Sequence, residues 1–185
     1  MHDEERGSSS ALEFGRIVLP HLDAAYNLAR WLVRNPHDAE DVVQDACMRA
    51  FKFFGGYQGG NARGWLLRIV RNAAYTFIEK RRPADLAEEF DETLHTGENG
   101  QSDVEDALLK SANAKILQEA LEDLPVRYRE VLILREIEGL SYKEIAEVVE
   151  IPIGTVMSSL ARSRAQLRER LVGIRRKEVP RGMSG

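Results

Sequence analysis

The sequence predicts an all-α protein made of two small helical domains joined by a flexible acidic linker. Apolar residues recur at helical spacing, and no segment shows the alternation with period two that is typical of a strand. Helix breakers then divide the chain at Asn35-Pro36, in glycine-rich 55–60 and at Pro83. The predicted division is an N-terminal tail and helix start at 1–19, a first domain at 20–83, the linker at 84–102, a second domain at 103–176 and a tail at 177–185.

The first domain is predicted to hold three helices. Residues 1–10 are polar and expected to be disordered, so the first helix is placed over 11–34. Pro36 suits the first turn of the second helix, over 37–54, because the N–H that proline lacks has no partner there. The third helix is placed over 62–82 and ends at Pro83.

Charge is distributed unevenly along this chain, whose formal net charge is −4. Ten basic residues face six acidic ones in 20–83, whereas 84–109 holds nine acidic residues and no basic one. A segment of this composition buries little apolar surface, so we interpret 84–102 as a linker rather than a packed element.

The second domain is predicted to contain four helices, over 103–122, 126–138, 142–150 and 155–174. Gly139 ends one helix, and Ser141 with Glu144 has the spacing of a capping box that opens the next. Pro152 and Gly154 then break the chain before the last helix. This order of elements is typical of a helix-turn-helix that places its last helix in the major groove of DNA.

The last predicted helix has one apolar and one basic side. From residue 155 to residue 177 there are seven basic residues and one acidic residue, Glu169. On the side away from the apolar stripe, Arg162 can donate two hydrogen bonds to guanine and Ser158 can donate or accept one. Arg164 flanks the stripe and suits a phosphate.

Several classes of function are not supported by the sequence. Cys47 is the single cysteine, so no internal disulfide forms, and the four histidines lack metal-ligand spacing. No catalytic constellation, nucleotide-binding loop, signal peptide or membrane span is apparent. We therefore expect a cytoplasmic protein that is not an enzyme, with no cofactor, metal, small-molecule substrate or direct membrane insertion.

Three motifs in the first domain resemble region 2 of bacterial sigma factors. They are Asp38-Ala-Glu-Asp-Val-Val-Gln-Asp-Ala46, Gly64-Trp-Leu-Leu-Arg-Ile-Val-Arg-Asn72 and Arg81-Arg82-Pro83. The stretch from Leu124-Pro125 to Arg164 resembles region 4, and no third domain fits between the two. This pair of motifs resembles the extracytoplasmic-function (ECF) group of the sigma-70 family.

The resemblance implies a non-enzymatic specificity subunit of core RNA polymerase. In the family, the helix that matches 38–54 docks on a coiled coil of the polymerase's largest subunit. Asp41 and Asp45 lie four residues apart and share one side of that helix, which suits an electropositive partner. The implied polymerase-binding residues are Asp38, Asp41, Gln44, Asp45 and Arg49.

The resemblance also implies that the −10 promoter element is bound as a melted single strand. An extruded base would enter a pocket formed by the loop at 57–64, with Tyr57 as a stacking platform and Asn61 as a polar contact. This loop is shorter than in relatives. The implied −10 residues are Tyr57, Asn61, Arg63, Arg68, Arg71, Asn72, Arg81 and Arg82.

The −35 element would be read as duplex by the last helix. Relatives often carry basic residues at the positions of Met157 and Ser159, so we expect an altered −35 preference. The implied −35 residues are Thr155, Ser158, Ser159, Arg162, Arg164 and Arg168.

The family's other partners follow from the same resemblance. The second domain would sit on the polymerase flap, the acidic linker would enter a polymerase channel, and an anti-sigma factor would hold the protein inactive. We expect the two domains to act as separate halves, with 55–60 open to solvent. Two alternatives are a response-regulator-type helix-turn-helix regulator and an interaction protein that mimics a sigma factor.

Overall fold

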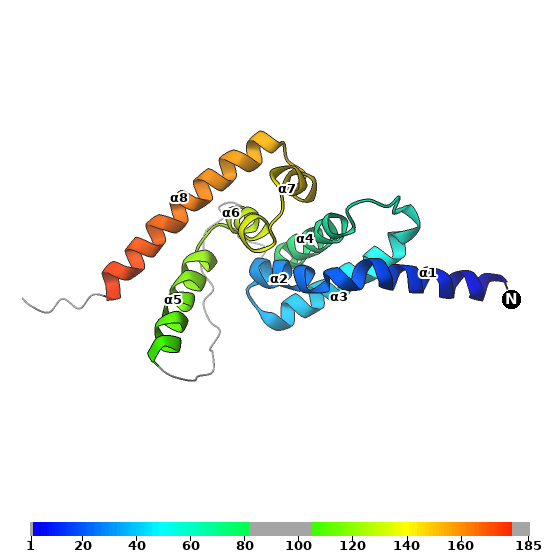
Figure 1. The fold of residues 1–185 in the computed structure, drawn as a ribbon, viewed down its shortest axis with the longest axis horizontal. Helices are drawn as coiled ribbons and strands as arrows, with labels where there is room; N and C mark the ends of the chain where they lie inside the picture. The colour runs from blue at the N-terminus through cyan, green and yellow to red at the C-terminus, as the bar shows by residue number, and fades with distance from the viewer. Residues whose placement is uncertain (1, 82–104, 179–185) are drawn as a thin grey trace, which may run out of the picture.

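A computed structural model describes residues 2–81 and 105–178, and every regular element in these two ranges is helical (Figure 1). The elements are α1 (His2–Val18), η1 (Leu19–His21), α2 (Leu22–Val33), α3 (Pro36–Phe53), η2 (Phe54–Gly56), α4 (Ala62–Arg81), α5 (Glu105–Glu122), α6 (Val126–Leu132), η3 (Ile133–Ile137), α7 (Tyr142–Val149) and α8 (Ile153–Glu178). We call α1 to α4 the first module and α5 to α8 the second module. The predicted all-α architecture is confirmed.

The core of the first module is formed by α2, α3 and α4, which pack against one another in all three pairs. Leu28 of α2 and Leu66 of α4 are fully buried, and Val42 of α3 is nearly so. Small residues such as Ala46 and Ala74 are also fully buried, and they allow the helices to approach closely.

The turn between α2 and α3 forms as predicted. Arg34 ends α2 in the left-handed conformation, with φ of 64°, and its N–H donates to the carbonyl of Arg30. The side-chain oxygen of Asn35 accepts from the backbone N–H groups of His37 and Asp38, at 2.9 and 3.2 Å. These contacts satisfy donors that the first turn of α3 would otherwise leave unpaired.

The helix-turn-helix of the second module is confirmed as well. Gly139 has φ of 67°, a left-handed conformation that glycine adopts without strain. The Ser141 hydroxyl accepts from the backbone N–H of Glu144 at 3.2 Å, and the Glu144 carboxylate accepts from the Ser141 backbone N–H at 2.8 Å. This reciprocal capping box fixes the start of α7.

Residues 133–137 form a π-helical turn rather than the continuation of an α-helix that the sequence predicts. The backbone N–H of Glu138 donates to the carbonyl of Ile133, five residues earlier, at 3.0 Å. Such turns are rare and are often found at functional sites.

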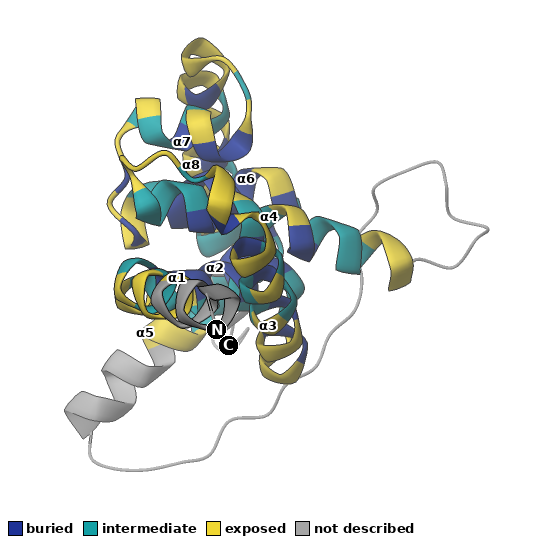
Figure 2. Ribbon diagram, turned by 90° about the vertical axis from the view of Figure 1, so that its right-hand side faces the viewer, coloured by how far each residue is buried: buried dark blue, intermediate teal, exposed yellow. Residues whose placement is uncertain are grey.

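The two modules pack against each other, whereas the sequence led us to expect separate halves. α4 lies against α7, and α2 lies against α6 (Figure 1). The buried apolar residues of both modules form one cluster, and buried segments of α2, α4 and α6 meet in the middle of the molecule (Figure 2). Because a small module cannot cover all its apolar surface, part of each is buried by the other.

The N-terminal end also differs from expectation, because α1 begins at His2 where a disordered tail is predicted. Phe14 and Ile17 pack against the core and Val18 is buried, so the end of α1 is anchored. Once a helix is nucleated, each further residue adds a hydrogen bond at small cost, which lets it extend through glycine and serine. The predicted linker at 84–102 lies outside the described residues. In the described ranges, no helix is both long and apolar enough to cross a membrane.

Candidate nucleic-acid interface

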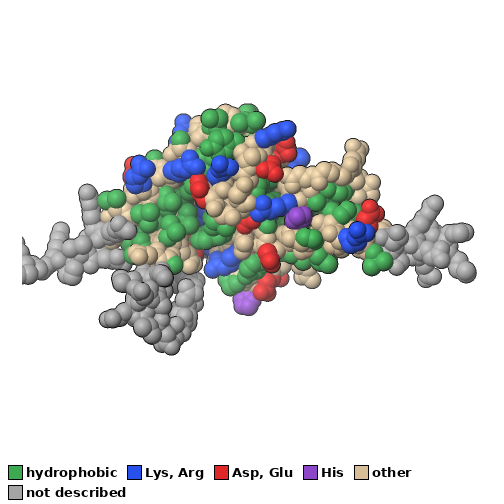
Figure 3. Space-filling view, viewed as in Figure 1, with side chains coloured by type: hydrophobic (Ala, Val, Ile, Leu, Met, Phe, Trp, Pro, Cys, Tyr) green, Lys and Arg blue, Asp and Glu red, His purple; other side chains and the backbone are tan. Residues whose placement is uncertain are grey.

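The outer side of α8 is an exposed polar surface. Thr155, Ser158, Arg162 and Arg168 are exposed, whereas Val156 and Leu160 on the opposite side are buried. Lysine and arginine side chains follow this helix in the space-filling view (Figure 3). Five of the six residues predicted to contact the −35 element therefore lie on or near accessible surface, while Ser159 is half-buried.

Arg164 is accessible but holds an internal partner. Its guanidinium donates to the carboxylate of Glu136 in the π-helical turn at 2.7 Å, and both side chains are about half exposed. This hydrogen bond raises the pKa of Arg164 further above its ordinary value. The ion pair positions α8 against the π-helical turn, and a DNA contact of Arg164 stays a prediction.

The glycine-rich loop at 55–60 is open to solvent, apart from its half-buried Tyr57. The Tyr57 ring stacks on Phe54 with centroids 6.0 Å apart and lies 4.9 Å from the ring of Trp65. Its hydroxyl donates to the carbonyl of Gly60 at 3.1 Å. Tyr57 is thus held in a fixed orientation by its neighbours, as a stacking platform requires.

Asn61 connects this loop to both modules. Its side-chain oxygen accepts from the backbone N–H of Gly64 at 2.9 Å, which caps the start of α4. Its amide nitrogen donates to Glu144 of the second module at 3.0 Å. A Cβ atom at Gly64 would lie 2.9 Å from that nitrogen, so a larger residue there would displace the Asn61 side chain.

The basic side of α4 is occupied by glutamates of the second module. Arg63 donates to the Glu138 carbonyl at 2.7 Å and to its carboxylate at 2.5 Å. Arg68 forms an ion pair with Glu150 at the end of α7. Arg63 and Arg68, which the sequence assigned to the −10 strand, therefore each pair with a glutamate of the second module, and their role in strand binding stays a prediction.

The most buried of these pairs joins Arg71 to Glu130. The guanidinium donates to the carboxylate at 2.6 Å, and the Tyr75 hydroxyl donates to its other oxygen at 3.0 Å. The Glu130 side chain is only 1% exposed. Burial raises the pKa of Glu130, although the charge of Arg71 opposes this effect. Burial and the nearby carboxylate also raise the pKa of Tyr75.

The remaining predicted −10 residues lie in different surroundings. Asn72 is exposed and accepts from Arg71 at 3.3 Å. Arg81 forms an ion pair with Asp38 at 2.6 Å. Arg82 lies outside the described residues.

Asp38 was predicted to face the polymerase, but its side chain is largely buried in the free protein, and the polymerase contact stays a prediction. Asp38 lies in the first turn of α3, is 9% exposed and is covered by Arg81 from the end of α4. Asp38 thus pairs with a basic residue at the end of α4, because α3 and α4 pack side by side.

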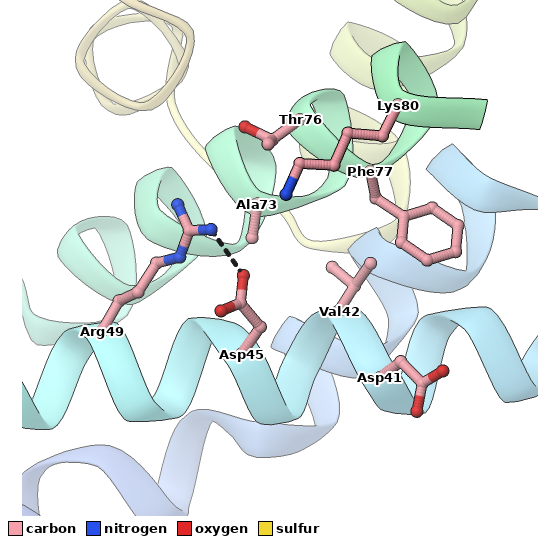
Figure 4. Close-up of a pocket in the computed structure, with 8 residues that line it drawn as sticks. All are labelled: Asp41, Val42, Asp45, Arg49, Ala73, Thr76, Phe77 and Lys80. Carbon is pink, nitrogen blue, oxygen red and sulfur yellow. Dashed lines mark ion pairs between the residues drawn. The ribbon is translucent and has the colours of Figure 1, made fainter. Parts of the chain in front are cut away.

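The other predicted polymerase contacts do share the outward side of α3. Asp41 and Gln44 are exposed, and Asp45 pairs with Arg49 at 2.8 Å on the helix surface. Asp41, Asp45 and Arg49 line a cleft of about 270 Å³ between α3 and α4 (Figure 4). The described residues contain no cluster of side chains that would hold a metal ion.

Sequence reasoning missed Met48 on this same side. It follows Gln44 by one helical turn and is 61% exposed. Its spacing of three and four residues from Asp45 and Gln44 was the signal that could have identified it.

Both modules match families of known proteins. Family models match residues 17–83 as Sigma-70 region 2 and residues 114–167 as Sigma-70 region 4. The ECF RNA polymerase sigma factor SigW of Bacillus subtilis is 32% identical over 165 residues, which cover 85% of this chain and 88% of SigW. This chain belongs to the ECF sigma factors of the sigma-70 family. The match at 17–83 argues against the alternative of a response-regulator-type regulator, because that alternative does not account for the first module.

Two further comparisons extend over most of this sigma factor. The ECF RNA polymerase sigma factor SigE of Mycolicibacterium smegmatis is 36% identical over 169 residues, which cover 89% of this chain but 64% of SigE. The sigma factor RpoE of Bartonella quintana, solved in complex with the anti-sigma factor NepR, has a TM-score of 0.64 at 30% identity. That likeness covers 86% of this sigma factor and 96% of RpoE, so it includes both modules.

The raised pKa of Glu130 predicts a pH-dependent contribution to the stability of this sigma factor. A carboxyl whose folded-state pKa lies above its ordinary value of 4.5 binds more protons folded than unfolded, so its contribution falls as the pH rises through the folded pKa. The free energy of unfolding of the wild type minus that of Glu130→Gln should therefore decrease from pH 4.5 upward, as measured by urea denaturation.

Glu147→Gln, which removes a carboxyl from an exposed site on α7, is the control. A wild-type advantage over Glu130→Gln that grows with pH would show that the ion pair with Arg71 outweighs the cost of burial.

Proposed function

We propose that this protein is an alternative sigma factor that binds core RNA polymerase and directs initiation at promoters with a −35 and a −10 element. One observation carries the proposal: the chain has two exposed surfaces on different modules. The first is an acidic surface on α3, and the second is the polar side of α8, a helix that would fit the major groove of DNA. An activator that binds DNA alone needs only the second of these surfaces.

The duplex would be read by α8. Behind the capping box, Thr155, Ser158 and Arg162 project from the start of the helix that enters the major groove in this motif. Arg162 is the residue that specifies a base, since two parallel hydrogen bonds to guanine distinguish it from the other bases. Arg168 lies further along the exposed side and suits a phosphate.

The melted strand would be bound by α4 and the loop that precedes it. Arg63, Arg68 and Arg71 offer donors for phosphates along one helix, and Tyr57 offers a ring for an unstacked base. Stacking of this kind contributes about 1–3 kcal/mol per base. Capture of unpaired bases, rather than hydrolysis, would thus favour the open promoter.

Core polymerase would bind the outward side of α3. Asp41, Gln44, Asp45 and Met48 form a mixed acidic and apolar surface that suits a basic helical partner, such as the coiled coil of the largest subunit. The second module would rest on the flap, with 84–102 directed to a polymerase channel. Tethering lets each module bind weakly on its own.

We propose that an anti-sigma factor regulates this protein. RpoE of B. quintana was solved with an anti-sigma factor, and an anti-sigma factor is the partner we propose for this chain. We also propose a cytoplasmic location, where core polymerase and promoter DNA are found.

Run-off transcription tests the proposed function. Core polymerase should initiate at a promoter with both elements only when this chain is added. Initiation that is equal with and without the chain would contradict the proposal.

Asp45→Arg should weaken binding to core polymerase by about tenfold, because it reverses a charge at the centre of the proposed docking surface. Fluorescence anisotropy with labelled protein measures this affinity. Glu13→Arg, an equal charge change on the exposed side of α1, should have little effect. Equal losses in the two variants would mean that net charge, and not α3, decides docking.

Arg162→Ala should reduce initiation at promoters with a −35 element by about tenfold, because one base-specific pair is worth about 1–3 kcal/mol. Affinity for core polymerase should not change. Lys115→Ala, which removes an exposed positive charge from α5, is the control in the same module. A parallel loss of polymerase affinity in Arg162→Ala would contradict this division of roles.

A further inference from the structure

Three exposed apolar side chains follow one another along the start of α8. Ile153 is 46% exposed, Met157 is 53% exposed, and Ala161 is exposed as well. Residues four positions apart lie one above the other on a helix, so these three form a single apolar row. Their neighbours Val156 and Leu160 point the other way and are buried. The apolar row is therefore open to solvent in the free protein.

The apolar row lies beside the polar residues that we propose to read the duplex. At about 100° per residue, Ser158 is at the middle of the exposed side, with Met157 on one flank and Arg162 on the other. Arg168 lies on the same flank as Met157, about three turns further along. The apolar row thus belongs to the same surface as the proposed DNA contacts.

The middle of this surface carries small side chains. Gly154, Ser158 and Ala165 are exposed there. Gly154 does not have a positive φ, and a Cβ atom added to it would meet no other atom within 4 Å, so neither conformation nor packing requires glycine. A helix with a low centre can approach base edges closely, and its longer flanking side chains, Met157 and Arg162, then reach furthest into the groove.

The two flanks suit different base pairs. Guanine offers two acceptors to a guanidinium in the major groove, whereas thymine alone among the four bases presents a methyl group there. Contact between that methyl group and the Met157 side chain removes apolar surface of both from water, which is favourable. A polar base edge against the same side chain would lose hydrogen bonds with water. The apolar row therefore favours thymine.

We propose that Met157, supported by Ala161, is a specificity-determining residue that contacts the methyl group of a thymine in the −35 element. This inference rests on the proposed function, because it requires α8 to enter the major groove. It adds a second base preference, on the opposite side of Ser158 from the guanine contact of Arg162. The −35 element of this sigma factor thus combines a guanine with a nearby thymine.

The other occupant that an exposed apolar row could have is an apolar surface of core polymerase. The charge around the row favours DNA, because residues 153–170 contain four arginines and one acidic residue, Glu169. A basic surface of this kind suits the phosphates on either side of a groove. A polymerase contact is accordingly one of the outcomes that the experiment distinguishes.

Removal of a single methyl group tests the inference with the full-length chain bound to core polymerase. Deoxyuridine differs from thymidine only in lacking the C5-methyl group, so it leaves the hydrogen bonds of the base pair intact. The thymines of both strands of the −35 element are replaced one at a time. Run-off transcription from a promoter that depends on this chain measures the effect of each replacement.

Deoxyuridine at one −35 position should reduce initiation by the wild type about fourfold, which is the loss expected for one buried methyl group. Met157→Ala should initiate less well with thymine and should make thymine and deoxyuridine equivalent at that position. Val172→Ala shortens another apolar side chain on α8, 45% exposed and about four turns further along, and is the matched control. It should keep the fourfold difference.

Equal sensitivity to deoxyuridine in the wild type and in Met157→Ala would overturn the inference, because another residue would then read the methyl group. The absence of any sensitive position would overturn it as well. In both cases a loss of initiation in Arg162→Ala would show that the proposed function stands.

Two further results have a different meaning. A fall in the affinity of Met157→Ala for core polymerase, measured by fluorescence anisotropy, would overturn the inference and assign the apolar row to a polymerase contact. Initiation that does not depend on the chain would overturn the proposed function itself, and the inference with it.

Discussion

Arg71 and Glu130 meet between the two modules, with the carboxylate almost fully removed from water. A buried carboxylate is costly unless it is paired and hydrogen-bonded, and here Arg71 and Tyr75 together supply those contacts. Moving α4 away from α6 would deprive the Glu130 carboxylate of its contacts with Arg71 and Tyr75. This pair joins α4 to α6, and the more exposed pairs of Arg63 and Arg68 join the same helix to the residues around α7.

Helix α4 has several structural roles in this sigma factor. Its apolar side completes the core with α2 and α3, while its polar side contacts the helix-turn-helix region. Its last turn reaches Asp38 at the start of α3 and removes that carboxylate from the surface. The surface of α3 that we propose to face the polymerase is therefore limited partly by what α4 covers.

Local signals in the sequence predicted most of the helix boundaries. Asn35-Pro36, Gly139 and the Ser141–Glu144 box act through hydrogen bonds within a few residues, so their effect can be seen in the sequence itself. The contacts of Glu138 and Glu150 with α4 could not be predicted in this way. They join residues 75 and 82 positions apart, and an isolated glutamate gives no sign of which distant arginine it will meet. The roles of the site residues stay predictions, and their partners in the free protein could not be predicted from the sequence.

The π-helical turn at 133–137 connects α8 of the second module with α4 of the first module. It carries Glu136, which holds Arg164 on α8, and it is followed at once by Glu138, which holds Arg63 on α4. A π-turn contains one residue more than the α-helical turn it replaces, so rewinding it would rotate the residues beyond it by roughly 100°. The turn thus links α8 to α4 through two glutamates that lie two residues apart.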